Sequence, residues 1–159
     1  MAPAADLNEE LMRIIGTRLG GHDVVDRVDK FPPEKPDRIV ATFADSVYPT
    51  PVSDAWLELR VRLNDDINIV YIENWAGDRH ECRWDRHDND HNTREHFHPP
   101  PSVTTATAMD VDLPADANRT VEIALRFIED RIRDCWQANE VTFPSDDEFR
   151  REYGPDIWR

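Results

Sequence analysis

Five of the six histidines in this 159-residue chain lie in one stretch, residues 79–102. Its sequence is RHECRWDRHDNDHNTREHFHPPPS, with four arginines among the histidines and three consecutive prolines near its end. Imidazole exchanges protons near neutral pH and binds transition metals, and the planar arginine fork suits phosphate. Most of the stretch has neither helical nor strand periodicity, so burial does not account for its composition. We therefore expect the chemistry of the protein to reside here.

His96 and His98 are the first candidates for this chemistry. Alternate residues of an extended chain point to the same side, so the two imidazoles can share a metal ion or act as acid and base on one phosphate. The alternative interpretation is two exposed loop histidines. Pro99–Pro101 favours a functional pair, because consecutive prolines form a stiff, extended mount beside His98.

Arg83, Asp85 and Arg86 complete the predicted catalytic set. The two arginines flank the end of an expected strand, where they could hold a phosphate and stabilise its developing charge. Asp85 could orient a histidine by accepting a hydrogen bond from its ring N–H. The alternative is a surface ladder of ion pairs at the strand end, with no catalytic role.

His87 and His91 suggest a different chemistry. Together with His96 and His98 they would supply enough imidazoles for a zinc, nickel or copper site. The spacing matches no known metal-binding signature, and the Asp and Asn residues between them favour turns over helix. We expect no cofactor, with a divalent transition metal such as zinc as the alternative. His80 is the least suitable candidate, since it falls within an expected strand.

The composition excludes several classes of protein. Five scattered glycines form no phosphate-binding loop, and Cys82 and Cys135 match no nucleophile or metal-ligand pattern, so we expect both to be packing residues. No apolar run is long enough to span a bilayer, and the N-terminus shows no signal-peptide pattern. These features predict a cytoplasmic protein that does not interact with membranes.

The chain is strongly acidic, with a net charge of −14 and only two lysines beside 17 arginines. An acidic surface maintains repulsion and solubility where salt screens charge. We interpret the composition as adaptation to high internal salt, as in halophilic archaea, with an ordinary acidic mesophilic protein as the alternative. The acidity would then reflect the solvent, and it does not exclude RNA as a partner.

The elements that must position these residues can be predicted from periodicity. An amphipathic helix capped by Asp6 is expected first, and a second is expected from Asp116 or Asn118. Residues 103–114 would form an extended crossing or an edge strand. The strands are expected at 24–31, 38–43, 56–63, 67–75 and 79–85. We predict one α+β domain over residues 1–159, with a core at 6–137 and a charged, aromatic tail at 139–159. Its antiparallel meander of four to five strands would carry the N- and C-terminal helices on one face.

The motifs of the central stretch resemble those of TumE-type toxins. The shared elements are Arg83-Trp84-Asp85, a spacer with His87 and His91, His96-Phe97-His98, Pro101-Ser102 and a closing amphipathic helix. The similarity covers roughly residues 55–137. Arg86 after the aspartate, the triple proline and a longer N-terminal part are departures from the family pattern.

The resemblance implies a toxin of a two-gene toxin–antitoxin system whose partner is a helix-turn-helix antitoxin. On this hypothesis the protein acts on RNA through His96, His98, Arg83, Asp85 and Arg86. The competing hypothesis is a non-catalytic module whose histidine-rich loop binds a metal or a partner.

Overall fold

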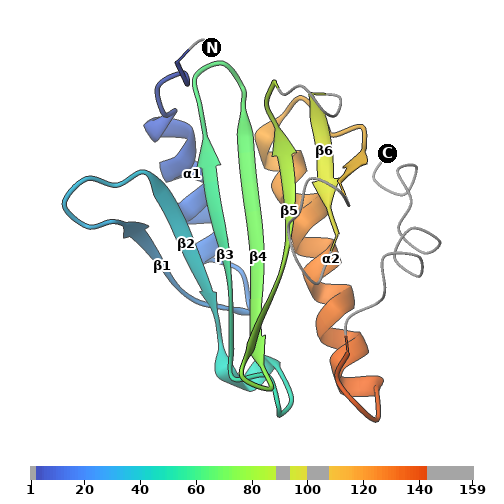
Figure 1. The fold of residues 1–159 in the computed structure, drawn as a ribbon. Helices are drawn as coiled ribbons and strands as arrows, with labels where there is room; N and C mark the ends of the chain where they lie inside the picture. Colours follow the sequence, from blue (N-terminus) through green and yellow to red (C-terminus); the bar gives the residue numbers. More distant parts are fainter. Residues whose placement is uncertain (1–2, 89–93, 100–107, 143–159) are drawn as a thin grey trace.

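The computed structural model describes residues 3–88, 94–99 and 108–142 (Figure 1). Within these ranges, two α-helices accompany seven strands that form one antiparallel sheet, in which strand order follows chain order. The sheet contains β1 (Val25–Phe31), β2 (Arg38–Phe43), β3 (Asp54–Val61), β4 (Ile67–Trp75), β5 (Asp78–Arg86), β6 (Glu95–His98) and β7 (Met109–Asp110). The helices are α1 (Glu9–Gly20) and α2 (Ala117–Gln137), and a short 3₁₀ helix spans Asp45–Val47.

The α+β class and the terminal helices are confirmed, but the predicted strand count is wrong. The sheet has seven strands in the described residues, not four to five. The strand that was not expected is β6, which has four residues, whereas β7, with two residues, is an edge strand within the segment 103–114 that was expected to be an extended crossing or an edge strand. Segments this short are hard to recognise from a period-2 pattern, and β6 ends at His98, directly before Pro99. The predicted aromatic tail lies mostly beyond residue 142, outside the described ranges.

The register of the central strands follows from a two-residue turn between β4 and β5. Ala76 and Gly77 both have positive φ, at 55° and 75°, as the tight turns that match strand twist require. Trp75 therefore pairs with Asp78, and the same register brings Asn68 opposite Asp85. A slip by one residue would turn every side chain of β5 to the other face of the sheet.

Both helices cover the same face of the sheet (Figure 1). The first helix begins at an Asn8 cap, whose side chain accepts a hydrogen bond from the Leu11 amide; the predicted Asp6 cap is wrong. Gly16 lets this helix approach β2 closely, because an added Cβ would lie 3.1 Å from Ile39 Cδ1. The second helix begins at Asp116, one of the two predicted caps.

Phe127 anchors α2 to the sheet. Its ring lies 6.2 Å from that of Tyr71, 5.3 Å from that of Trp84 and 6.5 Å from that of Phe97, all in edge-on arrangements. These partners belong to β4, β5 and β6, so one side chain joins the helix to three strands. Edge-on aromatic pairs add to the stabilisation from burial alone. The short strand β6 is thus held from the helix side through Phe97.

A buried ion pair lies beside this aromatic cluster. Glu73 on β4 has no solvent exposure and accepts hydrogen bonds from Arg131 Nε at 2.9 Å and Arg131 Nη2 at 3.1 Å. Tyr71 donates to Glu73 Oε1 at 2.6 Å, and Trp75 Nε1 donates to Oε2 at 3.1 Å. The Glu73 carboxylate is fully satisfied by protein donors, so we assign this pair a structural role.

Replacing Arg131 by alanine should destabilise the fold strongly, because Glu73 would remain buried without its counter-charge. Removing one partner of a buried pair costs about 3–5 kcal/mol. Urea unfolding followed by circular dichroism would measure the loss. Arg133→Ala is the matched control, since Arg133 lies on the exposed side of the same helix and, among the residues that the structure describes, forms an ion pair only with Asp130. Equal stability of the two variants would contradict the structural role of the pair.

Candidate functional site

The pairing of β5 with β6 gathers most of the residues that the sequence singled out. Arg83 lies opposite His98, and Asp85 lies opposite His96. Because side chains alternate along a strand, these four residues share the face of the sheet opposite the helices, and Trp84 and Phe97 between them face α2. His87 follows directly after β5. We call Arg83, Asp85, His87, His96 and His98 the Asp85 cluster.

The Asp85 carboxylate is the centre of the cluster and has no solvent exposure. Arg83 Nε donates a hydrogen bond to its Oδ2 at 2.6 Å. The Nε2 atoms of His96 and His98 each lie 3.3 Å from the same oxygen. The other carboxylate oxygen, Oδ1, accepts a hydrogen bond from Asn68 Nδ2 at 2.5 Å. The charge is therefore surrounded by groups from three adjacent strands.

Arg83 also contacts His98, with its Nη2 3.0 Å from His98 Nε2. The guanidinium has only donors, so in this contact His98 Nε2 accepts the hydrogen bond and carries its lone pair there. His96 Nε2 lies at the same distance of 3.3 Å from Asp85 Oδ2 as His98 Nε2. The two imidazole rings lie 4.9 Å apart between centroids. The two histidines thus share the Asp85 carboxylate, and His98 is in addition contacted by Arg83.

His87 is the most exposed histidine of the cluster, with 43% of its side chain accessible. Its Nε2 lies 3.7 Å from Asp85 Oδ2, and its ring centroid lies 4.8 Å from that of His96. The contact with Asp85 raises the pKa of His87 above its ordinary value. One ligand atom from each of Asp85, His87 and His96 falls within a group whose members all lie within 4.8 Å of one another. These three residues could hold a metal ion.

The cluster also controls the charge of Asp85. Burial alone raises the pKa of this carboxyl, because it disfavours the ionised form. The contacts with His87, His96 and His98 and the charge of Arg83 outweigh burial, and the pKa lies far below its ordinary value. Asp85 is therefore a fixed negative charge at physiological pH.

Arg86 does not join the cluster. It lies on the helix-facing side of β5, where it is 4% exposed. Its guanidinium donates to the Asp65 carbonyl at 3.1 Å and to the Pro114 carbonyl, and it pairs with Glu95. Side-chain alternation explains this difference from the prediction, since residues 83 and 86 are separated by an odd number of positions. Arg86 thus connects the strand to neighbouring segments and lies on the opposite face of the sheet from Arg83.

The remaining histidines of the central stretch lie elsewhere. His80 stacks on Trp75 with ring centroids 3.8 Å apart, near the opposite end of β5. His91, Pro101 and Ser102 lie outside the described residues. Trp84 is a fully buried core residue. Both cysteines are free and buried, and burial raises the pKa of Cys135 to about 11, as expected of packing residues.

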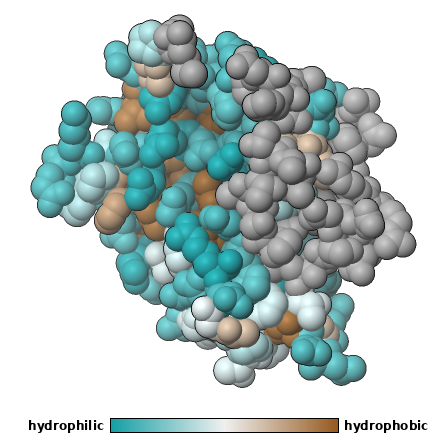
Figure 2. Space-filling model, in the orientation of Figure 1, coloured by the Kyte–Doolittle hydropathy of each residue, from teal (hydrophilic) through white to brown (hydrophobic). Residues whose placement is uncertain are grey.

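The sheet face that carries the cluster is largely polar. Figure 2 shows the described part of this face as mostly hydrophilic around scattered hydrophobic side chains. Arg38 pairs with Glu58, and Arg60 pairs with Asp37, so part of the face is a ladder of ion pairs at some distance along the chain from the Asp85 cluster. The cluster differs from this ladder because its carboxylate is buried and has imidazole neighbours.

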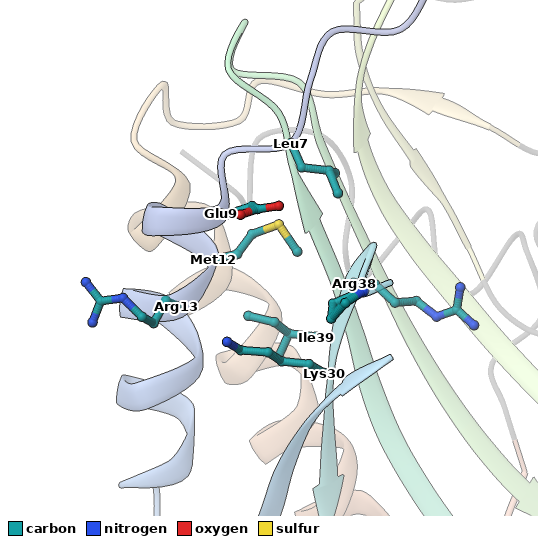
Figure 3. Close-up of a pocket in the computed structure, with 8 residues that line it drawn as sticks. Leu7, Glu9, Met12, Arg13, Lys30, Arg38 and Ile39 are labelled. Atoms are coloured by element: carbon teal, nitrogen blue, oxygen red, sulfur yellow. The ribbon is translucent and has the colours of Figure 1, made fainter. Parts of the chain in front are cut away.

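A separate pocket of about 150 Å³ lies between α1 and the first two strands. Figure 3 shows Met12 and Ile39 facing each other across it, with Arg13 pointing away. Its other lining residues are Leu7, Glu9, Lys30, Pro36 and Arg38. The lining residues include no histidine or cysteine, so the pocket lacks the imidazoles of the Asp85 cluster.

Sequence reasoning missed Asn68, which holds the second oxygen of Asp85. The sequence did contain a signal for it. A two-residue turn at Ala76-Gly77 pairs Trp75 with Asp78, and each step back along β4 is then matched by one step forward along β5. That register brings Asn68 opposite Asp85. The buried pair of Glu73 and Arg131 had no comparable signal, since it joins residues from distant segments.

Comparison with known protein families identifies the family of this chain. Residues 18–132, well over half of the chain, match the family described as Toxin TumE. No curated protein and no solved structure matched. None of the helices in the described part of the chain is long and apolar enough to cross a membrane. The family match begins earlier than the expected similarity and includes β1 and β2 as well as the whole Asp85 cluster. The chain therefore belongs to the TumE family of toxins.

Proposed function

We propose that this toxin acts on RNA through the Asp85 cluster. The observation that carries the proposal is the convergence of two histidine Nε2 atoms and an arginine on one buried carboxylate. Membership of a toxin family supports a growth-inhibiting activity and implies an antitoxin partner. We further propose that this partner is a helix-turn-helix protein, as the sequence resemblance suggested. RNA is proposed because the cluster combines proton-transfer groups with a phosphate-binding guanidinium.

Arg83 would make the first contact with a phosphate. Its side chain is 28% exposed, whereas those of His96 and His98 are each 4% exposed. The hydrogen bond from its Nε to Asp85 fixes the guanidinium, and a fixed donor stabilises developing charge without reorganisation. An RNA phosphate would thus be held beside the two imidazoles.

The two histidines would divide the proton transfers of phosphodiester cleavage. His98, whose Nε2 carries a lone pair, would accept the proton of the ribose 2′-hydroxyl as its oxygen attacks phosphorus. His96 would donate a proton to the 5′-oxygen as its bond to phosphorus breaks, leaving a cyclic phosphate. General acid–base catalysis of this kind contributes about 10²–10⁴-fold to the rate. Asp85 would stabilise the protonated form of His96 and fix the orientation of its ring.

Arg83→Ala should abolish most of the growth inhibition and slow RNA cleavage by about 10²-fold or more, since removal of a transition-state donor has effects of this size. The measurement is growth after induction, together with cleavage of a defined RNA by purified protein in concentrated KCl. High salt is included because the composition predicts adaptation to it. Arg79→Ala is the control, because Arg79 is an exposed arginine of the same strand.

His98→Gln should reduce cleavage at least as much, because glutamine can hydrogen-bond but cannot accept the proton. His80→Gln provides the matched control in β5. Circular dichroism would establish that both variants fold. The proposal of an RNA target fails if purified protein leaves RNA intact, or if folded Arg83→Ala and His98→Gln proteins inhibit growth as strongly as the parent.

A further inference from the structure

The geometry points to a transition-metal site formed by Asp85, His87 and His96. One oxygen of Asp85 and the Nε2 atoms of the two histidines would bind a single divalent ion of the zinc class. The inference concerns the ion alone and does not depend on the identity of the toxin's target. It differs from the sequence-based alternative, which paired His87 with His91 and did not include the aspartate.

The first argument is that nitrogen atoms crowd around one oxygen. Among the described side chains, Arg83 Nε and three histidine Nε2 atoms lie between 2.6 and 3.7 Å from Asp85 Oδ2. A carboxylate oxygen has two lone pairs, so it cannot form good hydrogen bonds with all four. A cation beside this oxygen accounts for two of these approaches, because the lone pairs of His87 and His96 and the carboxylate are then attracted to one point.

The second argument is the spacing of the three proposed ligands. A tetrahedral ion with bonds of about 2.0–2.1 Å requires its ligand atoms to lie about 3.3 Å apart. Asp85 Oδ2 and His96 Nε2 are 3.3 Å apart, and Asp85 Oδ2 and His87 Nε2 are 3.7 Å apart. The ligand atoms of all three residues lie within 4.8 Å of one another, so His87 would move closer to the other two ligands when the ion binds. His87 directly follows β5, and 43% of its side chain is accessible to solvent.

The third argument is that the surrounding structure holds the ligands in place. Asp85 and His96 lie opposite each other on paired strands. The backbone amide of His87 donates to the Arg94 carbonyl at 2.9 Å. Asn68 orients the carboxylate through its second oxygen, as outer-shell partners do in metal sites. The exposed side of His87 provides a path for the ion from solvent.

The ligand set also selects the metal. Two imidazoles with one carboxylate suit zinc and its neighbours, whereas magnesium and calcium prefer oxygen ligands throughout. His98 is already engaged by Arg83 at 3.0 Å, so we assign the fourth position to water. In the metal-loaded protein His96 would be a ligand and not the proton donor proposed above, and His98 would remain for proton transfer.

The test uses full-length protein purified with a removable tag that contains no histidine, stripped with a chelator and titrated with Zn²⁺, Co²⁺ and Mg²⁺. Concentrated KCl in the buffer suppresses adsorption to the acidic surface. Calorimetry would measure affinity and stoichiometry, and the visible absorption of Co²⁺ would report four-coordinate geometry. We expect one Zn²⁺ per chain, a four-coordinate Co²⁺ spectrum and no comparable binding of Mg²⁺.

His87→Ala and His96→Gln should each weaken Zn²⁺ binding by at least about tenfold, by comparison with losses seen even for outer-shell substitutions. His80→Gln should bind as tightly as the parent protein, because His80 stacks on Trp75 away from the cluster. His87 is half-exposed, so His87→Ala decides the matter even if His96→Gln does not fold. The inference is overturned if the parent protein binds no Zn²⁺, or if folded His87→Ala binds it with unchanged affinity.

Discussion

The buried charge of Asp85 is the constraint on which the arrangement of the site depends. A carboxylate without solvent exposure is strongly unfavourable unless charged or hydrogen-bonding groups surround it. Here Asn68, Arg83 and the histidines provide these groups from β4, β5 and β6. They reach it only in one register of the three strands, because a slip of one residue would turn them to the other face. The register and the charge compensation are therefore coupled.

The two buried carboxylates, one on each face of the sheet, have different surroundings. On the helix side, Arg131 binds both oxygens of Glu73, and Tyr71 and Trp75 complete its hydrogen bonds. Both oxygens of Glu73 are thus hydrogen-bonded within the protein, and the ion pair joins α2 to the sheet. On the other side, Asp85 is surrounded by more nitrogen atoms than one of its oxygens can accept, and two of the contributing side chains are partly exposed. This difference supports a structural role for Glu73 and a chemical role for Asp85.

The proposed site lies within the part of the chain that matches the toxin family. The toxin-family match includes all of β5 and β6, and these strands carry the whole cluster except His87, which directly follows β5. The aromatic contacts of Phe127 hold the opposite face of the same strands. An RNA-directed acid–base site and a metal centre would both require this support, because each needs its imidazoles held in position to within a few tenths of an ångström.

The sequence alone determined the α+β class, the two helices and five of the strands, because hydrophobic periodicity and turn residues are local signals. It also singled out His96, His98, Arg83 and Asp85 by residue type and spacing. Only the tertiary structure decided that β6 pairs with β5, that Arg86 faces away from the cluster, and that Asn68 and Arg131 reach buried carboxylates. These features depend on strand register and on contacts between distant segments, and short strands such as β6 have too few residues for a periodic pattern to reveal them.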